Sequence, residues 1–138
     1  MEQEAITWKE EYSVGLTTVD KQHQKFLTIL NELGTCIAEG SYKENGKSIF
    51  FALLHFADEY LLKEKMLVNS VSNIDYSHFR EKHKQFLAKL QLFKNEYNES
   101  ASEQLFVDLY EYLKQIYPQY ISYYTPSLIK ILKTYGIK

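Results

Sequence analysis

One apolar stripe interrupted by a histidine constrains the fold of this chain more than any other feature. Its positions are separated alternately by four and three residues: Phe79, His83, Phe86, Leu90, Phe93 and Tyr97. This spacing places all six side chains on one face of an α-helix, so the stretch predicts an amphipathic helix whose apolar face lies in a core. A histidine on such a face is either a metal ligand or a buried residue with a hydrogen-bond partner.

Three other stretches repeat the helical spacing of apolar residues. They cover about residues 21–38, 45–68 and 102–117, and the stripe through His83 belongs to a helix over about 76–97. We expect Asp20 and Asp75 to cap the first and third helices, Gly40 to end the first, and Pro118, which has no amide proton, to end or kink the fourth. Residues 5–19 alternate like a strand but have no partner strand, which favours an extended arm packed along the helices. The sequence therefore predicts one all-α domain over residues 1–138: an antiparallel up-and-down four-helix bundle with an extended N-terminal arm.

The composition argues against several classes of partner. The formal net charge is −2 and 25% of the residues are charged, so nucleic acid is not an expected partner. The N-terminus is acidic and lacks a long apolar run, so neither a signal peptide nor a membrane partner is expected. The single cysteine, Cys36, cannot form an internal disulfide, which favours the cytoplasm.

Short motifs near the N-terminus resemble those of a known family. They are Ile6-Thr7-Trp8, Tyr12-Ser13-Val14-Gly15-Leu16 and Val19-Asp20-Lys21-Gln22-His23. These resemble the I-x-W, Y-S-V-G-I and I-D-x-Q-H signatures of the hemerythrin family, the di-iron four-helix bundles that include bacteriohemerythrins. The resemblance covers the whole chain, and Asp75-Tyr76 before the third helix is also similar to the family pattern.

The resemblance implies a set of seven metal ligands, five histidines and two bridging carboxylates, of which this chain has three. Aligned without a gap, His23, Glu64 and His83 match ligand positions. The other four positions hold Tyr60, Phe79 and Ile116 in place of histidines and Ile121 in place of an aspartate. A full di-iron centre is therefore not expected. The remaining donors suit at most one iron or other divalent metal ion, to which Tyr60 could add a phenolate oxygen. Without metal, Glu64 is the expected hydrogen-bond partner of His83.

A rival alignment starts from His55-Phe56-Ala57-Asp58-Glu59, which matches the H-F-x-x-E motif of the family literally. Its two ligands, His55 and Glu59, do not lie on the apolar stripe of their helix. It also needs an insertion to use His78 as the next ligand, and His83 then lies about 140° around the helix from His78. We therefore favour the gap-free alignment and keep His55, Glu59 and His78 as lesser candidates.

These observations predict a hemerythrin-like binding or sensing module that is not an enzyme, is metal-free or holds one metal ion, and lacks ordinary reversible O2 binding. The alternative is an iron- and oxygen-binding carrier or sensor of the hemerythrin type that uses non-standard ligands. O2 or another small ligand is the candidate small molecule. Tyrosines cluster at the C-terminal end, at Tyr117, Tyr120, Tyr123 and Tyr124, so they are candidates for core packing and also for a contact with a second copy or another protein.

Overall fold

The structure is a computed structural model that describes residues 8–9, 13, 15–69, 77–121, 130 and 133–134. Within its helices, the side chains at positions 18, 61, 63–69, 77–80, 120 and 121 lie outside the description.

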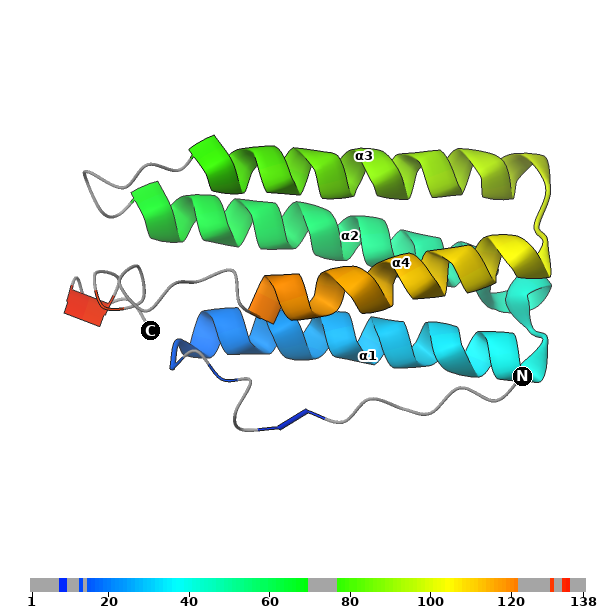
Figure 1. The fold of residues 1–138 in the computed structure, drawn as a ribbon, viewed down its shortest axis with the longest axis horizontal. Helices are drawn as coiled ribbons and strands as arrows, with labels where there is room; N and C mark the ends of the chain where they lie inside the picture. The colour runs from blue at the N-terminus through cyan, green and yellow to red at the C-terminus, as the bar shows by residue number, and fades with distance from the viewer. Residues whose placement is uncertain are drawn as a thin grey trace.

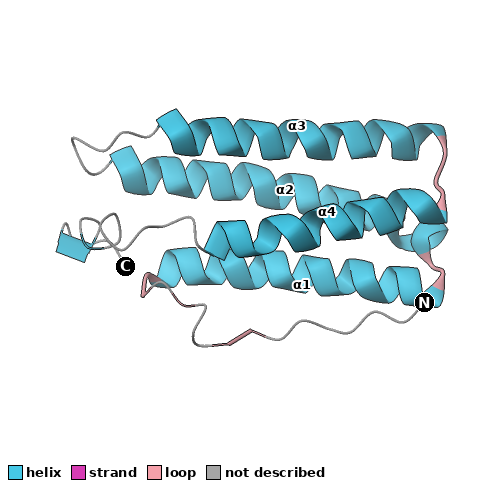
Figure 2. Cartoon of the chain, viewed as in Figure 1, coloured by secondary structure: helices cyan, strands magenta, loops and turns pink. Residues whose placement is uncertain are grey.

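Four helices form an antiparallel up-and-down bundle. They are α1 (Thr17–Glu39), α2 (Tyr42–Asn69), α3 (Ser77–Glu99) and α4 (Glu103–Ile121). Each helix runs opposite to the one before it (Figure 1). Successive helices pack on one another and α4 packs on α1, so the four enclose one core. No strand occurs among the described residues (Figure 2), and the predicted all-α four-helix bundle is confirmed.

Seven of the fifteen residues of the predicted N-terminal arm, 5–7, 10–12 and 14, lie outside the described residues, and its last three, 17–19, belong to α1. Before α1 the structure describes Trp8, Lys9, Ser13, Gly15 and Leu16, and the ring of Trp8 is half-buried against the core. No helix of the described part is both long and apolar enough to cross a lipid bilayer.

The apolar stripes turn inward as expected. Phe86, Leu90 and Phe93 of α3 are buried together with His83, and Tyr97 is half-buried. Each helix also contributes side chains with no accessible surface, among them Leu30, Phe56, Leu90 and Leu113. The side chain of Phe79, which begins the α3 stripe, lies outside the described residues.

The start of α1 differs from the prediction. The helix begins at Thr17, its N-cap residue is Leu16, and no side chain of the described part caps it. Asp20, which was expected to be the cap, lies in the first turn and accepts a hydrogen bond from the hydroxyl of Ser13. The prediction of an Asp20 cap is therefore wrong. A carboxylate in the first turn still interacts favourably with the helix dipole. The predicted cap of α3, Asp75, lies outside the described residues.

The sequence predicts the start of α4 better than its end. The backbone N–H of Leu105 donates to Ser102 Oγ over 3.2 Å, so Ser102, near which the fourth helix was expected to begin, caps it. Pro118 does not end α4, which continues to Ile121. Near a helix terminus the missing amide proton costs only one intrahelical hydrogen bond, so the last turn can persist.

The turn between α1 and α2 depends on a left-handed glycine. Gly40 has φ +68°, its N–H donates to Ile37 O over 3.2 Å, and the N–H of Ser41 donates to Cys36 O over 3.0 Å. This pair of hydrogen bonds is the Schellman motif, which commonly ends helices.

Replacing Gly40 with alanine should lower the free energy of unfolding by about 1 kcal/mol, because a Cβ is disfavoured at positive φ. No neighbouring atom of the described residues lies within 4 Å of a Cβ built at this position, so the cost comes from the backbone alone. Urea unfolding measures it. The matched control is Glu39→Ala, an exposed helical position, which should change stability by less than about 0.5 kcal/mol. An equal effect of the two variants would contradict this account of the turn.

Candidate functional site

Three polar side chains from three helices meet inside the bundle. His23 of α1 has no accessible surface, and Tyr60 of α2 and His83 of α3 each expose only 4%. His23 Nε2 lies 3.4 Å from the hydroxyl oxygen of Tyr60, and the two rings are stacked at 6.1 Å. The ring of His83 meets Tyr60 edge-on, with the centroids 4.9 Å apart. Tyr60 thus lies between two histidines that are 60 residues apart in sequence, in what we name the His23–Tyr60–His83 cluster.

Burial keeps both histidines of this cluster neutral. It lowers the pKa of His23 from 6.5 to about 4, although the negative charge of Asp20 acts in the opposite direction. Burial alone lowers the pKa of His83 to about 4. At pH 7 both imidazoles therefore carry a free-base nitrogen, which is the form that binds metal ions and accepts hydrogen bonds.

The cluster also contains polar atoms that lack a hydrogen bond. Neither Nδ1 of His23 nor Oε1 of the neighbouring Gln22 has a partner among the described residues, and both are inaccessible to solvent. The hydroxyl of Tyr60 lies at Nε2 of His23, so in either tautomer Nδ1 has no partner within the described part of the chain. A buried polar atom without a partner costs about 1–3 kcal/mol. The cluster is therefore suited to bind one more group.

For three other positions of the gap-free alignment the structure describes the backbone and not the side chain. The backbone of Glu64 lies one turn beyond Tyr60 on α2, and Phe79 lies one turn before His83 on α3, but their side chains are outside the described part. The same holds for Ile121 at the end of α4. Ile116 is half-buried against the apolar core, so α4 contributes a hydrocarbon group where the resemblance implies a histidine.

The rival pair lies on the outer side of α2. The side chain of His55 is 65% exposed and that of Glu59 is 24% exposed, with His55 Nε2 3.6 Å from Glu59 Oε2. The same carboxylate oxygen lies 2.8 Å from Lys25 Nζ of α1, and the His55 ring stacks on Phe51. This pair is therefore brought together at the surface, apart from the buried His23–Tyr60–His83 cluster. The side chain of His78 is outside the described residues.

The described part of the cluster brings together three candidate donor side chains, two imidazoles and one phenol. Within the described residues, no three His, Cys, Asp or Glu side chains come together in a way that could hold a metal. Two imidazoles and a phenol, completed by one carboxylate such as Glu64, would instead match a mononuclear site.

No protein-family model matches this chain, and no curated protein matches it either. The residues and their geometry are therefore the basis for assigning a function.

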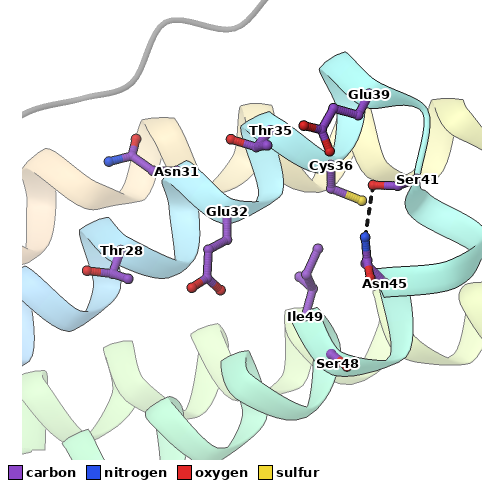
Figure 3. A pocket seen from close by; sticks show the side chains of 10 residues that line it. All are labelled: Thr28, Asn31, Glu32, Thr35, Cys36, Glu39, Ser41, Asn45, Ser48 and Ile49. Carbon is purple, nitrogen blue, oxygen red and sulfur yellow. Dashed lines mark hydrogen bonds between the residues drawn. The ribbon is translucent and has the colours of Figure 1, made fainter.

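A polar groove that the sequence did not single out lies where α1 meets the start of α2 (Figure 3). Its volume is about 550 Å³, and it is lined by hydroxyl, amide and carboxylate groups around one thiol: Thr28, Asn31, Glu32, Thr35, Cys36, Glu39, Ser41, Asn45, Ser48 and Ile49. Cys36 is buried, and burial raises the pKa of its thiol, which makes it a poor nucleophile. Polar residues recur at helical spacing on α1, but only the Schellman turn brings the start of α2 beside them.

Proposed function

We propose that this chain is a hemerythrin-like binding or sensing module without enzymatic activity, in which the di-iron centre has lost ligands and at most one metal ion is held. One observation carries the proposal. His23, Tyr60 and His83 occupy aligned ligand positions on three different helices, and they converge in the core. A convergence of this kind is typical of metal sites in helix bundles.

The donor chemistry supports one metal ion rather than two. His23 and His83 would hold it through neutral imidazole nitrogens, Tyr60 through its phenol oxygen, and Glu64 through the carboxylate that the alignment assigns to it. The apolar Ile116 supports the loss of ligands on the α4 side. A bound iron would supply a redox-active centre able to take O2 or another small ligand. The surrounding buried rings would exclude bulk water and keep the imidazoles neutral.

Reconstitution with ferrous iron under anaerobic conditions, followed by desalting and elemental analysis, tests this proposal. We expect no more than about one iron per chain. Where iron is bound, His23→Leu and His83→Leu should each reduce it to background. The matched control is His55→Leu, which changes an exposed histidine of α2 and should leave the iron content unchanged.

Two results would contradict this proposal. About two irons per chain, with the absorption band of a bridged di-iron centre in air, would favour the alternative, an iron- and oxygen-binding carrier with non-standard ligands. Iron that is lost in His55→Leu and retained in both core variants would move the site to the surface pair.

A further inference from the structure

The outward face of α2 has two exposed apolar side chains on either side of a polar pair. Phe51 is 74% exposed and Leu62 is 58% exposed, which makes them two of the three most exposed large apolar side chains in the described part. His55 and Asp58, both exposed, lie between them. Steps of four, three and four residues keep all four within about 60° of the helix circumference and within about 16 Å along its axis. We name this set the α2 outer stripe.

The α2 outer stripe is complementary to itself when it is reversed. Its midpoint lies between Phe56 and Ala57, because Phe51 and Leu62 are equally far from that point, as are His55 and Asp58. A two-fold axis there, perpendicular to α2, would pair two antiparallel copies of the helix. Phe51 would then face Leu62 of the second copy, and His55 would face Asp58 of the second copy. Symmetry makes each of these contacts twice.

A groove lies beside the α2 outer stripe, next to the place where Leu62 of the second copy would contact Phe51. A groove of about 580 Å³ runs between α2 and α3, and its lining is mixed: Phe50, Phe51, Leu54 and Tyr97 together with Lys47, His55, Asp58, Lys94 and Asn98. A leucine that faces Phe51 would lie at this groove, where Phe51 and Leu54 are the apolar side chains that it could contact. The same surface therefore presents a projecting residue, Leu62, and a recess that could receive it, as a two-fold interface requires.

We propose that α2 is the dimer interface of this protein and that a second copy of the chain packs antiparallel on its outer stripe. A second copy is the occupant favoured by charge, because the imidazole of His55, which also lies 3.6 Å from Glu59 Oε2 of its own helix, would lie opposite the carboxylate of Asp58 of the other copy. A purely acidic or purely basic partner would satisfy only one of the two. We expect a contact limited to one helix pair to be smaller than the standard interface of about 1,600 Å² and to give a weak, concentration-dependent dimer. This proposal is independent of any metal bound in the core.

Sedimentation velocity from about 1 µM to about 500 µM protein tests the interface. We expect the wild-type chain to shift from monomer to dimer across this range. Leu62→Lys should raise the dissociation constant at least about tenfold, since it replaces the apolar contact with Phe51 by a cation beside a groove that already contains Lys47 and Lys94. The matched control is Leu92→Lys on α3, whose leucine is also 58% exposed, and it should leave the dissociation constant unchanged. Circular dichroism verifies that both variants are folded.

A charge exchange tests the geometry itself. His55→Asp should weaken the dimer at least about tenfold, because it puts like charges opposite each other at two places. The double variant His55→Asp/Asp58→His is self-complementary again and should recover wild-type affinity within about threefold. Both variants carry the same new repulsion from Glu59, which lies 3.6 Å from His55, so that effect cancels in the comparison. A wild-type chain that stays monomeric throughout, an equal effect of Leu92→Lys, or a double variant as weak as the single one would each overturn the proposal.

Discussion

Lowering the pH from 7 to 4 is expected to destabilise this bundle by several kcal/mol through His23 and His83. Burial holds both pKa values at about 4 in the folded chain, against 6.5 in the unfolded chain. Between these values the unfolded chain binds protons that the folded chain does not, so the free energy of unfolding falls as the pH falls through this window. Each histidine accounts for about 3 kcal/mol at most. Together they approach the whole stability of a typical domain, about 5–15 kcal/mol.

Urea unfolding at a series of pH values, with a chelator present, measures this loss. The chelator matters because a bound metal ion competes with protons for the imidazoles. His83→Leu removes one of the two buried bases, so it should roughly halve the pH dependence between pH 6.5 and 4. Leu92→Ala, at an exposed position of α3 without a titratable group, is the control and should leave the dependence unchanged. If His83→Leu kept the full wild-type dependence, groups other than this histidine would be the source of the acid sensitivity.

Hydrophobic periodicity was sufficient to predict the fold. Each helical stripe in the sequence became the inward face of one helix, because four amphipathic helices joined by short turns can bury their stripes only against each other. The helix ends were harder to predict. Asp20 has the side chain of a cap, but its carboxylate binds the hydroxyl of Ser13, seven residues earlier, and α1 begins at Thr17 instead. Helical periodicity does not encode a bond to a residue before the helix.

The same helical periodicity predicted part of the candidate site. The stripe pattern alone places Tyr60 and His83 on inward faces, and the structure brings both together with His23. The motif His55-x-x-x-Glu59 matches the residue types of the family's H-F-x-x-E motif, which the gap-free alignment does not. Whether it can act as a ligand pair in the core depends on the direction in which the two side chains point. In the structure it faces solvent and Lys25. That Nδ1 of His23 has no partner among the described residues could not be predicted, because it depends on where the surrounding side chains lie in three dimensions.

Replacing Phe26 with alanine is expected to lower the free energy of unfolding by about 3–5 kcal/mol. Phe26 of α1 is 1% exposed and its ring contacts one aromatic ring from each of the other helices. The centroids lie 5.3 Å from Phe56 of α2, 6.0 Å from Phe86 of α3 and 5.4 Å from Tyr117 of α4. Truncation would therefore leave a cavity that no single helix can close by shifting, and it would remove three aromatic pairs.

Urea unfolding at about 1 µM protein, where the proposed dimer is dissociated, measures this cost. The matched control is Phe51→Ala, because that phenylalanine is 74% exposed and should cost less than about 0.5 kcal/mol. Similar losses for the two variants would contradict the central position of Phe26.

The same substitution links the core to the candidate site. Phe26 lies one turn after His23 on α1, and Phe86, which stacks on it, lies one turn after His83 on α3. These two rings are therefore placed to keep water from both histidines on one side. Water that enters the cavity of Phe26→Ala would weaken the effect of burial and move the pKa of His23 back toward 6.5. The variant should accordingly lose stability at pH 7 and also part of its pH dependence between pH 6.5 and 4. A variant that is destabilised but keeps the full pH dependence would show that the histidines are shielded by other side chains.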